Sequence, residues 1–117
     1  MQFSTRVLGV HEEGHWCVIA LEMSLRGYGS TFNEALENLH DTIEAQVSFA
    51  LQHDTLDSIW KPAEPHYVEL YQSVRNRSMR HYLESSEEDV GFNDEAEYVA
   101  SDLPLPRSNH SPYEALA

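Results

Sequence analysis

The stretch RGYGSTFNEALENLHDTI, residues 26–43, combines a glycine-rich strand end with a strong helix start. Thr31 is a favourable N-cap, and Glu34, three residues later, completes a capping box. Gly29 stands just before this cap and allows a sharp turn of the backbone from strand to helix. The stretch therefore predicts a short strand over 24–29 that feeds directly into a helix.

The predicted helix runs to about residue 53, because the apolar pattern is lost beyond it and Pro62 forbids continuation. On the solvent-facing side of this helix we expect the acidic residues Glu37, Asp41 and Glu44. On the opposite side, apolar residues recur at spacings of three and four and form one stripe. The stripe consists of Leu36, Leu39, Ile43, Val47 and Ala50, extended by Phe32 and Leu51.

Two further strands are predicted upstream, at 3–11 and 15–23, joined by a three-residue hairpin loop at 12–14. Gly14 would take the left-handed position that closes this loop. His11 and His15 would then face each other across the loop mouth. Apolar residues occupy both faces of the second strand, which predicts a central strand with cover on each side. One face carries Cys17, Ile19, Leu21 and Met23, and the other carries Trp16, Val18, Ala20 and Glu22.

The C-terminal half is less regular. Pro62 and Pro65 bracket an extended link, and the following residues 66–83 fit either a helix or an edge strand, with the helix favoured. Residues 84–102 hold eight acidic residues and no basic one, and 103–117 hold three of the five prolines. This composition predicts that 84–117 is a flexible, solvated tail.

Composition restricts the class of partner. The 117 residues suit one domain with a tail, and 20 acidic against 7 basic residues give a formal net charge of −13. Such a surface repels nucleic acid phosphates and attracts basic proteins. One cysteine excludes a disulfide framework. The start of the chain does not read as a signal peptide, and no apolar run is long enough to span a bilayer. We therefore expect a cytoplasmic protein.

The order strand–strand–strand–helix, with GYGST-x-x-EAL-x-N at the junction and P-x-x-P after the helix, resembles the HicB-like antitoxin family. The resemblance covers roughly residues 3–65, about half of the chain. It is a fold motif and names no catalytic residue. The residues that carry it are Gly27, Gly29, Ser30, Thr31, Glu34, Ala35, Leu36, Asn38, Pro62 and Pro65.

The resemblance implies an α+β protein with a partial ribonuclease-H-like fold, a β-β-β-α core with a possible fourth strand, that usually dimerises. The implied function is neutralisation of a small basic mRNA-cleaving toxin. Many members also carry a C-terminal DNA-binding module. This chain departs from the pattern: LEMS (21–24) lacks the proline common there, 66–83 may not be a strand, and no DNA-binding module is recognisable.

Chemistry is poorly supported by the sequence. A metal-dependent nuclease needs several converging carboxylates, and the strands supply only Glu22. His11 and His15 could hold a metal with a neighbouring glutamate, but solvent-facing histidines are the simpler interpretation. Cys17 is interpreted as a core residue rather than a nucleophile. The sequence therefore predicts no enzyme, no cofactor and no metal site.

Candidate partner-binding residues are aromatic or apolar. Trp16 and Trp60 could each be an interface anchor or a core residue. In the acidic tail, Phe92, Tyr98 and Leu103 could anchor a segment that lies in the toxin's groove in place of RNA, although the tail could also be a spacer. A basic cluster, Arg75, Arg77 and Arg80, could hold the tail, touch a phosphate or be solvated.

Two functions follow. The first is an antitoxin that covers the active site of a small basic toxin, dimeric through an edge strand or through residues 66–83. The alternative is a stand-alone HicB-like regulatory or scaffold domain with no toxin partner. Neither requires direct contact with nucleic acid or membrane.

Overall fold

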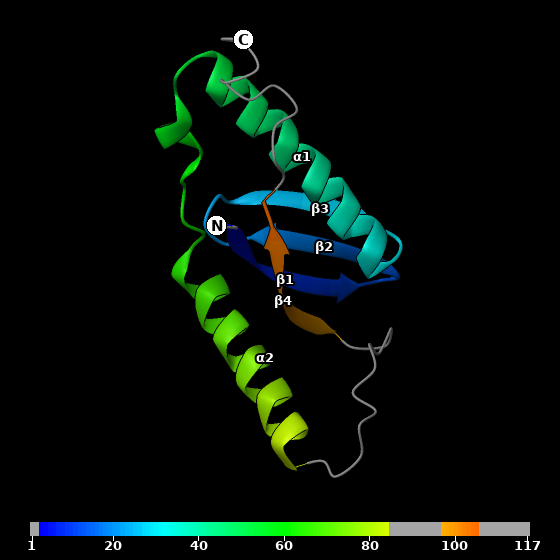
Figure 1. Ribbon diagram of the computed structural model, residues 1–117. Coiled ribbons are helices and arrows are strands. Elements are labelled where there is room, and N and C mark those ends of the chain that lie inside the picture. Colours follow the sequence, from blue (N-terminus) through cyan, green and yellow to red (C-terminus); the bar gives the residue numbers. More distant parts are fainter. Residues whose placement is uncertain (1–2, 85–96, 106–117) are drawn as a thin grey trace.

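The structure is a computed structural model that describes residues 3–84 and 97–105. Its sheet has four strands in the order β3-β2-β1-β4, and every neighbouring pair is antiparallel (Figure 1). The α+β class predicted from the sequence is confirmed. The elements are β1 (Ser4–Glu12), β2 (His15–Ala20), β3 (Leu25–Gly29), α1 (Phe32–Gln52), the 3₁₀ helix η1 (Leu56–Ile59), α2 (Pro65–Glu84) and β4 (Tyr98–Pro104).

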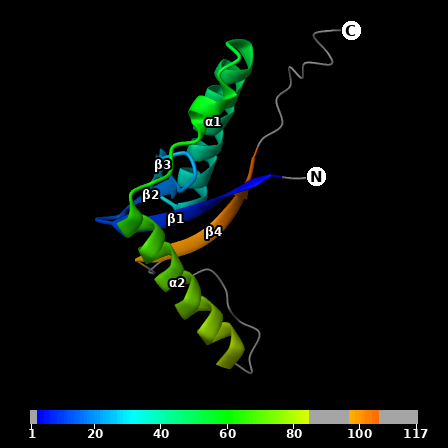
Figure 2. The ribbon, with the colours of Figure 1, turned by 90° about the vertical axis from the view of Figure 1, so that its left-hand side faces the viewer.

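The two long helices lie on opposite faces of the sheet (Figure 2). Trp16, Val18 and Ala20 of β2 pack with α1, whereas Ile19 packs with α2, so the predicted cover on both sides of this strand is confirmed. Met23 was predicted to share a face with Ile19 but packs in the α1-side core. The reason is that β2 ends at Ala20, after which the alternation of a strand no longer applies.

The β1–β2 hairpin is tighter than predicted. Glu12 pairs with His15, so the loop has two residues, Glu13 and Gly14, and both have positive φ, 51° and 78°. This is the type I′ pattern that matches the twist of a hairpin, and the left-handed Gly14 is confirmed. His11 does not face His15. Its partner across the strands is Trp16, on which its ring stacks at 4.5 Å between centroids.

Helix α1 begins as predicted. Thr31 is the N-cap and its hydroxyl accepts the backbone N–H of Glu34 at 3.1 Å, while the Glu34 carboxylate accepts the N–H of Thr31 at 3.3 Å. Leu51 is 36% exposed and does not extend the buried stripe. The residues that bury the helix are Phe32, Ala35, Leu39, Ile43 and Ala50, with Leu36 and Val47 half-buried.

Two glycines let α1 lie directly on β3. A Cβ atom at Gly27 would come within 2.5 Å of the Leu39 backbone nitrogen, and one at Gly29 within 2.6 Å of the Ala35 nitrogen. Gly29 is not among the positive-φ glycines of the described residues. Its role is therefore close approach of the helix rather than the sharp turn that the sequence suggested.

Residues 66–83 are helical and belong to α2, which settles the predicted alternative in favour of the helix. The fourth strand comes instead from 98–104, inside the segment predicted to be a flexible tail, so that prediction is wrong at β4. β4 pairs along β1 from Ser4↔Pro104 to Val10↔Tyr98. Its side chains Val99 and Leu103 pack on the α1-side core, and burial of this apolar surface stabilises the strand.

Candidate functional site

Glu22, which was predicted to lie on a strand, lies in the turn between β2 and β3 and forms structural contacts. Its carboxylate accepts hydrogen bonds from the Thr5 hydroxyl, the Arg6 backbone N–H and the Arg6 guanidinium, each at 2.7 Å. Burial alone would raise the pKa of Glu22, but these hydrogen bonds and the Arg6 charge outweigh it and leave the pKa lowered. Every oxygen of this carboxylate is engaged, which ties the start of β1 to the β2–β3 connection.

Glu22→Gln is expected to lower the free energy of unfolding at pH 7 by about 1–2 kcal/mol, because it weakens charge-assisted hydrogen bonds at a partly exposed site. Since the folded pKa of Glu22 is lowered, wild type holds this contribution above the unfolded pKa and loses it as pH falls through the folded pKa. Urea unfolding of both proteins from pH 7 down to pH 3 checks this. A difference in stability that stays constant across that range would contradict it.

The described residues contain no group of three or more His, Cys, Asp or Glu side chains placed to hold a metal ion. The stacking of His11 on Trp16 separates it from His15, so the two histidines predicted as a possible pair do not form one. Cys17 is half-buried at the margin of the α2-side core rather than within it. In residues 3–84 and 97–105, no helix is both long and apolar enough to cross a membrane.

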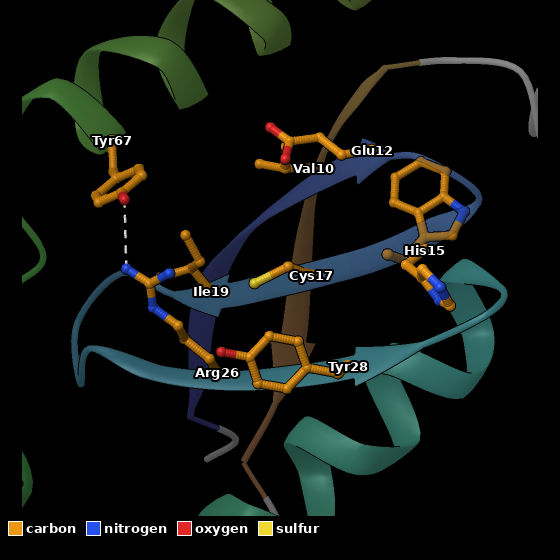
Figure 3. A pocket seen from close by; sticks show the side chains of 9 residues that line it. Val10, Glu12, His15, Cys17, Ile19, Arg26, Tyr28 and Tyr67 are labelled. Carbon is orange, nitrogen blue, oxygen red and sulfur yellow. Dashed lines mark hydrogen bonds between the residues drawn. The ribbon is translucent and has the colours of Figure 1, made fainter.

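A pocket of about 360 Å³ opens on the α2-side face of the sheet, where α2 does not cover β2 and β3 (Figure 3). At one end the Arg26 guanidinium lies over the Tyr67 ring, 5.4 Å from its centroid, and donates to the Tyr67 hydroxyl at 3.3 Å. This hydrogen bond raises the pKa of Arg26. Tyr28 is 61% exposed. The lining residues are Val10, Glu12, His15, Trp16, Cys17, Ile19, Arg26, Tyr28 and Tyr67.

The opposite side of the molecule carries an acidic ridge, defined here as Glu37, Asp41 and Glu44 of α1. All three are exposed, and their spacing of four and three residues places them along one line of the helix. No lysine or arginine occurs between Phe32 and Gln52. The predicted solvent-facing position of these residues is confirmed, and the described contact of the ridge with a basic side chain is that of Asp41 with His40, 3.9 Å away.

Exposed apolar side chains follow the C-terminal end of α1. Leu56 of η1 is 43% exposed and Trp60, directly after η1, is 47% exposed. Trp60 is thus on the surface, as a partner-binding residue must be, whereas Trp16 is 2% exposed and belongs to the core. Exposed apolar side chains therefore lie beyond the C-terminal end of the helix that carries the acidic ridge.

The other predicted partner-binding residues do not form a flexible segment. Tyr98 and Leu103 are half-buried in β4, and Leu103 packs on the α1-side core, so the prediction that they anchor a mobile tail is wrong. They are held because β4 completes the sheet. Phe92 lies outside the described residues.

Two contacts near the sheet edges were not recognisable from sequence. The Asn38 side chain accepts the backbone N–H of Tyr28 at 2.9 Å, so α1 caps the outer edge of β3. The Arg75 guanidinium donates to the Tyr71 hydroxyl at 3.0 Å and lies 3.9 Å from the Asp102 carboxylate. One of the three clustered arginines therefore does contact an acidic residue of the C-terminal segment, while Arg77 and Arg80 are exposed.

Comparisons of this chain with protein-family models, with curated proteins and with solved structures found no match. The fold and surfaces thus define a class only: an α+β domain with an antiparallel four-stranded sheet between two helices. Its described surface includes an acidic ridge on α1, an exposed Trp60 and an open pocket on the α2-side face of the sheet.

Proposed function

We propose that this protein is a non-catalytic antitoxin that neutralises a small basic mRNA-cleaving toxin by covering its active site. The observation that carries the proposal is the acidic ridge of α1, a line of exposed carboxylates on a helix that has no lysine or arginine, together with the exposed Trp60 beyond the C-terminal end of that helix. A ribonuclease groove must be positive to hold RNA, so a negative ridge with an aromatic anchor complements it.

The HicB-like resemblance supports the same function. The motif residues act together: Gly27 and Gly29 admit α1, Thr31 and Glu34 cap it, and Asn38 closes the β3 edge. A partial ribonuclease-H-like fold, as the resemblance implies, would place α1 on one face of a sheet in which the first three strands are neighbours. The observed strand order β3-β2-β1 with α1 on one face is compatible with this.

The net charge extends the complementarity beyond the ridge. A formal charge of −13 on 117 residues attracts a basic partner over distances of about a Debye length, roughly 8–10 Å at physiological salt. Steering of this kind speeds encounter, while the apolar contact at Trp60 and Leu56 would slow dissociation. An antitoxin benefits from both because free toxin must be captured quickly and held.

The double substitution Glu37→Lys and Asp41→Lys is expected to abolish capture of a basic protein of toxin size from the native lysate. Tagged wild type should retain that protein in stoichiometric amount, and the purified captured protein should cleave mRNA unless wild type is added. The readout is mass spectrometry of the captured material followed by an RNA cleavage assay.

Glu64→Lys with Glu69→Lys is the matched control, because it makes the same change of charge at exposed positions on the α2 side. This control should capture the toxin nearly as well as wild type. If both double variants lost capture of the toxin equally, the loss would reflect the change in net charge rather than the position of the ridge. A captured protein without RNA cleavage activity, or none at all, would overturn the antitoxin proposal.

A stand-alone HicB-like regulatory or scaffold domain is the second candidate, and the pocket beside Arg26 favours it. Arg26 has a tyrosine hydroxyl as its partner in the described structure, and the pocket combines this cation with the Glu12 carboxylate, His15 and aromatic and apolar side chains. If no toxin is captured, this pocket becomes the feature that a regulator would use.

A further inference from the structure

We propose that two copies of this chain associate through the outer edges of their β4 strands, and that the C-terminal half of each α2 fills the pocket of the other copy. The proposal goes beyond the antitoxin function and does not depend on it, because it concerns the opposite face of the sheet from the acidic ridge. It rests on three features that the described part of a single copy leaves unpaired or uncovered: an open strand edge, an overhanging helix and an open pocket.

The first feature is the edge of β4. The backbone N–H of His11 donates to the carbonyl of Glu97, and that of Leu105 to the carbonyl of Phe3, both at 2.8 Å. In this register the odd-numbered residues of β4 bond to β1, so the backbone groups of the even-numbered residues point outward. No described strand pairs with this edge, and the Asp102 carbonyl accepts only the Ser101 hydroxyl, at 3.4 Å, among the described residues. The outward residues are Tyr98, Ala100, Asp102 and Pro104, the last without an N–H.

The sheet has one other edge, and it is capped. Asn38 accepts the N–H of Tyr28 at 2.9 Å, which occupies a backbone donor that an added strand would need. β3 has five residues, whereas β4 has seven. Because unpaired edges recruit further strands, β4 is the edge at which another copy is expected to add.

The second feature is the course of α2 across the sheet. Tyr67 lies beside Arg26 of β3, and Arg75, eight residues later, lies beside Asp102 of β4. Eight helical residues rise about 12 Å, close to the roughly 14 Å that separates the first and fourth strands of a sheet. Between these two contacts the helix packs mainly on β1 and β4, while the long Arg26 side chain reaches its first turn from β3. What remains, residues 76–84, extends about 13 Å past the edge of β4.

The overhanging part of α2 is not covered. Every residue from Arg75 to Glu84 is exposed, and the C-terminal end of the helix lies away from the sheet in both ribbon views (Figures 1 and 2). Met79 and Tyr82 are 48% and 65% exposed, and Tyr82 follows Tyr71 by eleven residues, about three turns, on the face that packs on the sheet. An isolated half-helix of this length is marginal in water, so a covering surface is expected.

A two-fold axis through Ala100 brings the three features together. Antiparallel pairing of β4 with its copy then sets Asp102 opposite Tyr98 of the second copy. Each α2 passes β4 at Asp102, so the two helices are separated by four residues along the paired strands, about 13 Å at ~3.3 Å per residue. The overhanging residues 76–84 continue over the second copy's β4, β1 and β2 at the level of Tyr98, Val10 and Cys17. Val10 and Cys17 line the pocket.

Charge gives the overhang one local partner in a second copy. Arg75, Arg77 and Arg80 are three of the seven basic residues in the chain and all lie on or next to the overhang. They would lie over a pocket whose lining includes the Glu12 carboxylate as well as Arg26. Two copies of net charge −13 repel each other at long range, so the interface depends on the strand pairing and the apolar contact rather than on net charge.

The test measures mass and thiol reactivity on the full chain. Light scattering should give twice 13.4 kDa for wild type. Cys17 provides a native reporter, because a maleimide should label it at least about tenfold more slowly in the dimer than in the monomer that dilution releases. Ala100→Pro removes an outward N–H without touching the bonds to β1, and Tyr82→Arg places a charge on the apolar stripe. Both should be monomeric with rapidly labelled Cys17.

Ser73→Arg is the matched control, since it adds the same side chain to an exposed position of α2 on the side away from the sheet. It should remain dimeric with Cys17 protected. A monomeric wild type overturns the proposal, and so does a dimer that survives both Ala100→Pro and Tyr82→Arg. If these variants fail to fold, the wild-type dilution series decides: labelling of Cys17 that does not change with concentration refutes the interface.

Discussion

Gly27→Ala is expected to lower the free energy of unfolding by about 3 kcal/mol or more, or to prevent folding. The added methyl group would lie 2.5 Å from the Leu39 backbone nitrogen and 2.7 Å from the Leu39 Cβ, so the obstacle is helix backbone rather than a movable side-chain end. Relief requires α1 to lift from β3, which opens the core at Leu39 and Ile43. Thermal unfolding followed by circular dichroism measures the effect.

Gly14→Ala is the control for glycine loss itself. Gly14 has φ +78° in the hairpin loop, and a Cβ there meets nothing within 4 Å. Its substitution should therefore cost only the left-handed conformational penalty, about 1 kcal/mol. If Gly27→Ala were no more harmful than Gly14→Ala, the close contact of α1 with β3 would not be a determinant of stability.

Truncation after Glu97 is expected to destabilise the protein severely, because it removes β4. The truncated chain loses three half-buried side chains on the α1-side core, Val99, Leu103 and Leu105, together with the ladder along β1. Half-burial of three such side chains contributes about 2–4 kcal/mol, a large part of the roughly 5–15 kcal/mol that stabilises a domain. Urea unfolding of the truncated chain checks this result.

A chain that ends after Leu105 supplies the comparison. It keeps β4 and the Leu105 N–H bond to the Phe3 carbonyl, so its unfolding midpoint should stay close to that of the full chain. If both truncated chains were as stable as the full chain, β4 would not belong to the folded unit. The 84–117 segment would then behave as the tail that its composition predicts.

The start of the fold could be predicted because its signals are local. The capping box at Thr31 and Glu34, the apolar period of α1 and the glycine of the hairpin each act within a few residues. Their predicted positions agree with the structure to within one or two residues. The loop length was wrong because Glu13, rather than Glu12, accompanies Gly14 at positive φ.

The fourth strand could not be predicted because its determinants are not local. Residues 98–104 follow an acidic run and precede a proline-containing end, and only pairing with β1, some ninety residues earlier, makes them a strand. For the same reason Tyr98 and Leu103 were assigned to a partner's groove rather than to the sheet. Both side chains were recognised as apolar, but Leu103 packs on this chain's own core and Tyr98 pairs with Val10 of β1.

The candidate surfaces also differ in whether local sequence patterns predict them. The acidic ridge follows from helical spacing, so the sequence was sufficient to place Glu37, Asp41 and Glu44 in solvent. The pocket, the Asn38 contact and the overhang of α2 depend on how elements that are distant in the sequence pack against one another. No pattern within one element contains that information.

The pairing of the last strand with the first has a kinetic consequence. β1 acquires its β4 neighbour only after residue 104 has been synthesised, so this strand edge stays open while the intervening residues are made. Contacts of such high sequence separation form slowly. If β4 separates from β1, the same edge opens again and becomes accessible to proteases and to pairing with other chains.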